Sequence, residues 1–260
     1  MSISRIAALA AAAFLSIATQ ASASPWYLNS AGGGNPWNNT TNDTAMNDVF
    51  GAGNWNLGAF ETVDVATLVA TNDLIFLDGS DDGANELETF LNANRATLEA
   101  FVFGGGSIFV NSAPNEGDGM DLLLGASLVN SDFCGGDCTV QAAGNAIIDG
   151  PFGTLASVFG GSYFSHATVT GADTALIVQA GTDNGVILGE TRYGAGMALF
   201  GGMTTTNFHS PGADAVALRN NILAYAAEGV GASAAVPLPA SAPLLVAGLG
   251  LIGFLRRRAA

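Results

Sequence analysis

The residues best suited to nucleophilic chemistry are one serine and two histidines. Ser112 follows the apolar run 107–111, and the only histidines, His166 and His209, lie in polar segments from which either could approach it. A histidine beside a serine can remove the hydroxyl proton, which is the basis of covalent hydrolysis. However, the sequence around Ser112 lacks the G-x-S-x-G elbow that exposes a serine nucleophile. The alternative is that Ser112 caps a turn and that both histidines bond to local backbone, so these three residues are only candidates.

A second candidate site is a set of oxygen-bearing side chains at alternate positions. Asp78, Ser80 and Asp82 are followed by a glycine, which repeats the first half of a calcium-binding loop. The twelfth position of such a loop needs a bidentate glutamate, but here it is Thr89. Nearby glutamates could substitute only in a loop unlike an EF-hand. The alternative is a solvated acidic loop between a strand and a helix, and the sequence indicates no other cofactor.

The two cysteines are separated by three residues, as Cys134-Gly-Gly-Asp-Cys138. The terminal segments described below direct the chain to an oxidising compartment, where a small disulfide ring is the first interpretation. The two glycines allow the tight turn that such a ring requires. A metal site would need more ligands than the neighbourhood offers, and redox pairs usually have two intervening residues. We therefore predict a Cys134–Cys138 disulfide.

The charge of the chain is strongly one-sided. It has 22 acidic residues, no lysine and a net charge of −15. Apart from the two ends, the only basic residues are Arg95, Arg192 and Arg219. Nucleic acid and anionic lipid are therefore poor partners, whereas divalent cations would be attracted.

The pattern of apolar residues predicts an α/β domain. The runs 73–78 and 107–111 are continuously apolar, as expected for strands buried on both faces of a parallel sheet. Between them, apolar residues recur at helical spacing from Asn85, which is expected to cap the helix. This strand, helix, strand order predicts a right-handed crossover. We also expect a short helix at 120–128, a brief strand at 145–148 and a final helix at 213–228.

The first 23 residues have the features of a signal peptide. Arg5 lies in a short basic region, residues 6–17 are apolar, and Ala21-Ser22-Ala23 forms a small-residue cleavage site. We expect signal peptidase to release a chain that begins at Ser24.

The last 25 residues combine three features in a fixed order. The motif Val236-Pro237-Leu238-Pro239-Ala240 precedes an uncharged apolar run, which ends at the arginines Arg256, Arg257 and Arg258. Such a run is near the lower limit for crossing a bilayer, and the arginines would stay on the cytoplasmic side.

This tail resembles the VPLPA variant of the PEP-CTERM sorting signal. The resemblance implies an exosortase-type membrane protease as a partner, an intermediate anchored in the inner membrane, and final release to the cell surface or outside the cell. The alternative is a plain membrane anchor. The expected organisation is a signal peptide at 1–23, an exported domain at 24–230, a linker at 231–235 and the sorting signal at 236–260.

The body of the chain also resembles a known superfamily. The stretches LIFLDG, FVFGGGSIFVNSAP, YGAGMALFGGMTTTNF and ALRNNILAYAA are similar to the class I glutamine amidotransferase-like superfamily, especially its ThuA-like branch. The resemblance implies a flavodoxin-like, doubly wound, mostly parallel sheet with sites at the carboxyl ends of its strands. It implies no activity, because residues 111–113 hold Asn-Ser-Ala where amidotransferases need a cysteine.

Two classes of function remain open from the sequence. The first, which we expect, is a non-catalytic surface module for matrix or extracellular polysaccharide. The second is a secreted hydrolase or sugar-active enzyme with a strand-end site around Asp78, Ser112 and the two histidines. The sequence leaves enzymatic activity undecided.

Overall fold

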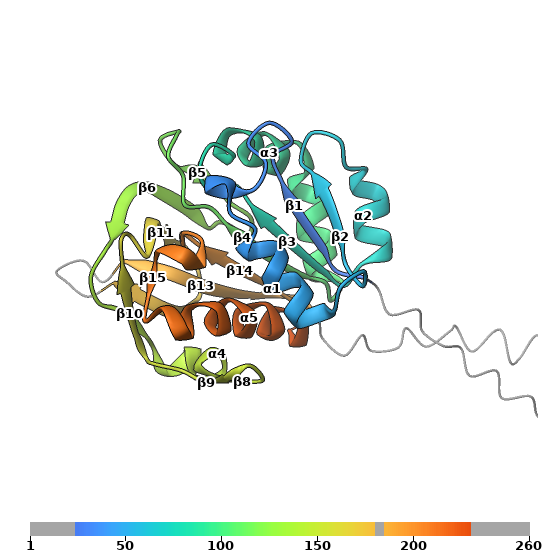
Figure 1. The fold of residues 1–260 in the computed structure, drawn as a ribbon. Coiled ribbons are helices and arrows are strands. Elements are labelled where there is room, and N and C mark those ends of the chain that lie inside the picture. Colours follow the sequence, from blue (N-terminus) through green and yellow to red (C-terminus); the bar gives the residue numbers. More distant parts are fainter. Residues whose placement is uncertain (1–23, 180–184, 230–260) are drawn as a thin grey trace, which may run out of the picture.

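A computed structural model describes residues 24–179 and 185–229 of the chain (Figure 1). The expected signal peptide at 1–23 and the sorting signal at 236–260 lie outside these residues. None of the helices within the described ranges combines the length and the apolar character needed to cross a bilayer.

The centre of the fold is a sheet of five parallel strands. In spatial order they are β2 (Asn56–Ala59), β1 (Trp26–Asn29), β3 (Leu74–Asp78), β4 (Ser107–Asn111) and β14 (Gly196–Gly201). Strands β3 and β4 are buried along their whole length, as their continuous apolar runs predict. The carboxyl ends of all five strands therefore meet at one edge of the sheet.

The rest of the sheet is antiparallel, so the expected parallel arrangement is confirmed for the centre of the sheet and not for its whole width. From β14 the order continues through β13 (Val186–Tyr193), β12 (Thr174–Gln179), β7 (Cys138–Val140), β10 (Val158–Gly161) and β15 (His209–Ser210). Strand β11 (Ser165–Thr170) pairs with β13 and with β6 (Ser127–Cys134), and β6 also pairs with β5 (Met120–Asp121). A separate hairpin joins β8 (Asp149–Gly150) to β9 (Gly153–Thr154). Many of these strands are short and bounded by glycine, so they lack the long apolar run that would predict a buried strand.

Helices cover both faces of the parallel strands (Figure 1). Helices α1 (Thr41–Phe50) and α5 (Gly212–Glu228) pack together on one face, and α2 (Val65–Thr71) and α3 (Ala84–Phe103) on the other. The short α4 (Asn145–Ile148) packs beside α5, and three 3₁₀ turns complete the structure, η1 (Pro36–Asn38), η2 (Ala142–Gly144) and η3 (Thr206–Phe208). The architecture is therefore mixed α/β with a largely parallel centre.

Each face has its own apolar core. One core gathers side chains of β1, β3 and β4 with α1 and α5, and in it the rings of Phe76 and Phe109 stack with centroids 4.8 Å apart. The other core joins the opposite faces of the same strands to α2 and α3, with Leu87, Leu91 and Leu98 fully buried. Because successive side chains of a strand point to opposite faces, one apolar run supplies both cores.

The structure differs from three local predictions. Residues 120–128 form no helix, because Leu124 (φ 57°) and Gly125 (φ 79°) make a left-handed turn that places Met120 opposite Leu128 in β5 and β6. Residues 145–148 form α4 and no strand, since packing of the buried Ile147 outweighs the strand preference of two isoleucines. Helix α3 begins at Ala84 after Gly83, so Asn85 lies inside the helix and does not cap it.

Candidate functional site

A buried polar network lies where β3 and β4 end. Asp78, the last residue of β3, accepts hydrogen bonds from Ser80 N at 2.9 Å, Ser80 Oγ at 2.5 Å and Asn42 Nδ2 at 2.6 Å. Asn111, the last residue of β4, donates to Met203 O at 2.8 Å and accepts from Met203 N at 3.1 Å. These bonds tie together the segments that follow β3, β4 and β14. The network therefore fixes the carboxyl edge of the sheet.

A buried cation lies beneath this network. Arg219 of α5 has its guanidinium carbon 5.9 Å from the ring centroids of both Phe76 and Phe109, and its Nη2 donates to Thr204 O at 2.8 Å. Burial lowers the pKa of Arg219, and the charge of Asp78 opposes that shift. The network thus contains the buried carboxylate of Asp78 and the buried guanidinium of Arg219, whose opposite charges partly offset each other.

Ser112 is placed as a structural residue. It is fully buried, its hydroxyl donates to Gly79 O at 2.9 Å, and its backbone N–H donates to Gly201 O at 2.8 Å. No hydrogen bond joins Ser112 to either histidine in the residues that the structure covers. The arrangement is the turn-capping alternative, since an enclosed hydroxyl cannot meet a substrate.

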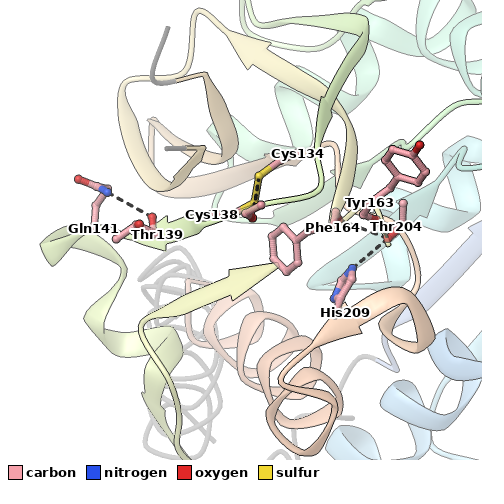
Figure 2. Close-up of a disulfide and its surroundings, with 9 residues drawn as sticks. Cys134, Cys138, Thr139, Gln141, Tyr163, Phe164, Thr204 and His209 are labelled. Atoms are coloured by element: carbon pink, nitrogen blue, oxygen red, sulfur yellow. Dashed lines mark hydrogen bonds between the residues drawn. A yellow bond between two sulfur atoms is a disulfide. The ribbon is translucent and has the colours of Figure 1, made fainter. Parts of the chain in front are cut away.

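His209 is also buried and bonds locally (Figure 2). The Thr204 hydroxyl donates to Tyr163 O at 2.8 Å, so it accepts from His209 Nε2, 3.0 Å away, and this nitrogen carries the proton. Burial and the nearby charge of Arg219 lower the pKa of His209 to about 3. His209 is therefore a neutral structural side chain at physiological pH.

The calcium candidates do not converge. Asp78 and Ser80 are buried and bond to each other, whereas Asp82 is exposed. Within residues 24–179 and 185–229, no group of three or more His, Cys, Asp or Glu side chains could hold a metal ion. The carboxylate of Asp78 is already satisfied by protein donors.

His166, by contrast, lies within a group of aromatic side chains at the same edge. Its ring centroid lies 5.6 Å from Trp37, 4.8 Å from Phe133 and 5.7 Å from Tyr163, in each case with the rings nearly perpendicular. Phe208 packs against Trp37 with ring centroids 5.3 Å apart. We call Trp37, Phe133, Tyr163 and Phe208 the aromatic cluster. Tyr163 is 56% exposed and Phe133 48% exposed, so part of the cluster faces solvent.

The imidazole of His166 is held neutral inside this cluster. Burial lowers its pKa, while the Pro114 backbone and the charge of Asp81 partly oppose the shift. Its Nδ1 is buried and has no hydrogen-bond partner in the described part of the chain. His166 therefore supports the aromatic rings without carrying a positive charge near neutral pH.

Backbone strain gathers at the same place. Five non-glycine residues among those described have a left-handed φ, and four of them lie in segments that form or support the aromatic cluster: Trp37 (51°), Asn38 (51°), Asp81 (60°) and Tyr163 (72°), the fifth being Leu124 (57°). Such conformations cost about 1–3 kcal/mol each and concentrate at functional sites. This clustering favours a site at this edge over an ordinary surface.

Asp81 connects the segments that carry the cluster. One carboxylate oxygen accepts from Trp37 N at 2.8 Å and the other from Asn115 Nδ2 at 2.6 Å, while its backbone bonds to Ala113 and Asn115. The loops after β1, β3 and β4 are thus held together through one side chain. Asp81 positions the Trp37 ring beside His166.

The predicted disulfide is confirmed and lies next to the cluster (Figure 2). The bond from Cys134 to Cys138 closes the turn between β6 and β7, immediately after Phe133. Beside the disulfide turn, Gly161 (φ 131°) lets two backbones approach closely, because a Cβ there would lie 2.1 Å from Phe208 O. Both features fix the spacing of the exposed rings.

A hollow of about 350 Å³ lies between the end of β2 and the first turns of α3. Its lining includes Glu61 and Glu86 above the phenylalanines Phe60 and Phe90. Burial alone would raise the pKa of Glu61, but the Ala31 N–H and the Ser30 hydroxyl hold it below the ordinary value. Glu86 has one buried carboxylate oxygen, Oε2, without a described hydrogen-bond partner. The hollow therefore presents two glutamates in different environments.

Sequence reasoning named Asp78 and the two histidines as candidates and considered Glu86 only as a substitute calcium ligand, but it missed the aromatic cluster and Glu61. The rings come from the loop after β1, from β6, from the turn after β10 and from η3, so no local spacing relates them. The available signal was the position of Trp37 and Tyr163 in glycine-, asparagine- and serine-rich loops, where a large aromatic side chain has no core to join.

No protein-family model matches this chain, and no curated protein sequence matches it. Among solved structures it is similar to the cold-adapted beta-galactosidase from Rahnella sp. R3, with 13% identity, a TM-score of 0.46, and coverage of 78% of this chain and 31% of that one. It is also similar to the beta-galactosidase from Bacillus circulans sp. alkalophilus, with 13% identity, a TM-score of 0.43, and coverage of 77% and 30%. A third is Gan42B, a GH42 beta-galactosidase, with 12% identity, a TM-score of 0.35, and coverage of 70% and 27%.

This chain spans about a third of the length of those proteins, so their activity is not transferred to it. These structures carry beta-galactosidase names, which differ from the expected non-catalytic module, but with TM-scores below 0.5 they assign no activity to this chain. The part of the alternative, a sugar-active enzyme, which relied on Ser112 is revised, since its hydroxyl is enclosed and bonded to Gly79.

Proposed function

We propose that this chain is an exported, sugar-active protein that binds a glycan at the carboxyl edge of its parallel strands. The observation that carries the proposal is the aromatic cluster around His166, which is partly exposed and is built on strained backbone. Exposed apolar patches rimmed by polar groups mark binding sites. Strain at such a patch is maintained only where the surrounding structure enforces it.

The chemistry of the cluster suits a carbohydrate. A pyranose ring has faces of C–H groups that pack on aromatic rings, and hydroxyls that bond to carboxylates and amides. Tyr163 and Phe133 offer the exposed rings, while Asp81 and Asn115 are polar groups beside them. The ring centroids of Phe133 and Tyr163 lie 5.5 Å apart, so the two rings together present an apolar platform wider than a single ring.

Bond cleavage at this edge would fall to Glu61 and Glu86. Glycoside hydrolysis uses two carboxyl groups, one that donates a proton to the leaving oxygen and one that acts as nucleophile or base. Glu61 suits the ionised role, because hydrogen bonds lower its pKa. Glu86 lines the same hollow and is proposed as the second carboxyl group.

The strand order supports the finer fold prediction of a flavodoxin-like domain. Numbered along the chain, the parallel strands follow the order 2-1-3-4 and then β14, and the order reverses between β1 and β3. In such sheets, ligands bind outside the carboxyl ends at this reversal. The loops after β1 and β3 carry Trp37 and Asp81. The amidotransferase-like resemblance remains a proposal about ancestry and adds no activity.

Export and sorting remain proposals based on the two ends of the sequence. Intact mass of the protein from the cell surface and medium tests them, in normal cells and in cells without the sorting protease. A species that begins at Ser24 and ends near residues 236–240 only in normal cells supports processing. A species that ends at Ala260 in both would mean that the tail is a plain anchor.

A matched pair of aromatic sites tests glycan binding. Tyr163 and Phe133 at the cluster are to be compared with Tyr193 and Phe103, which are 43% and 59% exposed with ring centroids 5.3 Å apart at the opposite edge. Tyr163→Ala should weaken binding to a panel of oligosaccharides at least tenfold, by loss of one stacked ring, whereas Tyr193→Ala should leave it unchanged. Equal effects of the two substitutions would remove the cluster as the binding site.

Release of reducing ends tests the catalytic assignment on whichever oligosaccharide binds. Glu61→Gln and Glu86→Gln should each reduce the rate by at least a hundredfold without changing binding, because each removes one partner of an acid and base pair. Glu88→Gln, on the same helix but outside the hollow, is the control. Full activity in both variants would assign the chemistry elsewhere.

A further inference from the structure

The arginines of the described domain are all engaged by protein groups. Arg95 donates to the backbone carbonyls of Leu122 and Asp121. Arg192 pairs with Glu190, and Arg219 is buried against Thr204 O. No lysine exists in the sequence, and the remaining arginines lie in the two terminal segments. A bound ligand at the carboxyl edge therefore meets no free cation of the described domain.

The same edge carries carboxylates that only neutral groups contact. Asp81 accepts from Trp37 N and Asn115 Nδ2, and Glu116 accepts from Asn85 N at 3.2 Å. Asp82 is exposed next to Asp81. Neutral donors orient a carboxylate but leave its charge uncompensated. In the described residues the one ion pair is Arg192 with Glu190, which lies away from these loops.

We propose that the carboxyl edge selects glycans that carry free amino groups, such as chains with unacetylated hexosamine units. This inference rests on the proposed glycan-binding function and specifies the charge of its ligand. The carboxylates attract an ammonium group and repel a uronate or a sulfate. The aromatic rings add to this preference, since an ammonium group is attracted to the face of an aromatic ring.

The neutral state of His166 completes the argument. Among the described side chains in ring contact with the aromatic cluster, this imidazole is the one that could become positive, but burial among the rings keeps it uncharged near neutral pH. An acidic sugar would have to leave water without gaining a countercharge, which is unfavourable. An amino sugar stays hydrated on the side that faces solvent, and its ammonium group is attracted by the carboxylates.

The test uses three hexasaccharides of equal length and the exported domain with its disulfide intact. They are a β-1,4-linked glucosamine hexamer, its fully N-acetylated form and a hexamer of galacturonic acid, each titrated calorimetrically at pH 6. The glucosamine hexamer should bind about tenfold more tightly than the acetylated form at low salt, and the difference should shrink to about threefold or less at 0.5 M salt. The galacturonate should not bind measurably.

Variants separate charge selection from stacking. The double change Asp82→Asn and Glu116→Gln should weaken binding of the amino sugar about three- to tenfold and leave the acetylated hexamer unaffected. Asp81 is kept because it positions Trp37. Asp149→Asn, an exposed carboxylate on the separate β8–β9 hairpin, is the matched control.

Failure of this inference is distinguishable from failure of the glycan-binding proposal. Equal or tighter binding of the acetylated or acidic hexamer, still weakened by Tyr163→Ala, would overturn the charge selection and keep the aromatic site. The charge selection would also be overturned if the double variant left the preference for the glucosamine hexamer unchanged. Absence of binding by all three hexamers and by the wider panel would contradict both.

Discussion

The buried His209 predicts a specific dependence of stability on pH. Its pKa is about 3 in the folded protein, through burial and the charge of Arg219, against an ordinary value of 6.5. Between these values the unfolded chain binds a proton that the folded chain excludes. The stabilising effect of a neutral His209 is therefore complete above pH 6.5 and is lost as the pH falls toward 3.

The size of this effect follows from the two pKa values. Each pH unit within the window changes the free energy of unfolding by up to about 1.4 kcal/mol, so His209 alone accounts for a loss of about 2 kcal/mol between pH 7.5 and pH 5. Few carboxylates titrate in that interval, which leaves the histidines as the main contributors. His166 adds to the loss in the same direction, because burial lowers its pKa as well.

His209→Gln tests the reasoning, because glutamine can donate to the Thr204 hydroxyl and does not titrate. Urea denaturation at pH 5, 6 and 7.5 should show a variant whose loss of stability is smaller than that of the wild type by about 2 kcal/mol. The same denaturation experiment on His166→Gln measures the contribution of the second histidine to the pH dependence of stability. A variant with the full wild-type dependence would refute the assignment, as would an NMR titration of His209 with a midpoint above pH 5.5.

The remaining predictions concern the buried charges and the disulfide. Arg219→Met should lower the free energy of unfolding by about 3 kcal/mol, because it leaves the buried carboxylate of Asp78 without its offsetting charge. Arg192→Met on the exposed surface should cost less than about 1 kcal/mol in the same denaturation experiment, and equal losses would argue against a special role for the buried cation. Replacement of both Cys134 and Cys138 by serine should cost about 2 kcal/mol, as expected for a short closed loop, and should weaken glycan binding through the adjacent rings. Thermal unfolding with and without reductant measures this loss, and an unchanged melting temperature would contradict it.

Local sequence signals predicted the elements whose environment is uniform. Strands β3 and β4 are buried on both faces, so each residue had to be apolar and the run was visible. The helix between them also followed from spacing, although its first residue did not, because Glu116 from a distant loop caps the Asn85 N–H. In the antiparallel half, apolar stretches indicated strands near β11, β12 and β13, but their pairing and the strands β5 and β6 were not predicted, since turn geometry at Leu124 and Gly125 decides the register there.

At the candidate site, too, local sequence signals predicted some features, and contacts between distant segments decided the others. Asp78 was predicted because it directly follows a buried strand, and the structure places it at the carboxyl edge. The catalytic roles considered for Ser112 and His209 depended on distances between segments, and tertiary packing instead produces the alternative, with both side chains bonded to the backbone or hydroxyl groups of their neighbours. The aromatic cluster was not predicted because its rings converge only when four segments distant in sequence are folded together.

The sequence by itself determined the parallel strand pair, the disulfide, the strong negative charge and the absence of lysine, because each is a property of composition or of neighbouring residues. Only the tertiary structure decided that Trp37, Phe133 and Tyr163 surround one neutral histidine and that Asp81 joins the loops beneath them. The physical reason is that burial, electrostatic coupling and ring packing depend on distances through space, which the order of residues along the chain does not specify.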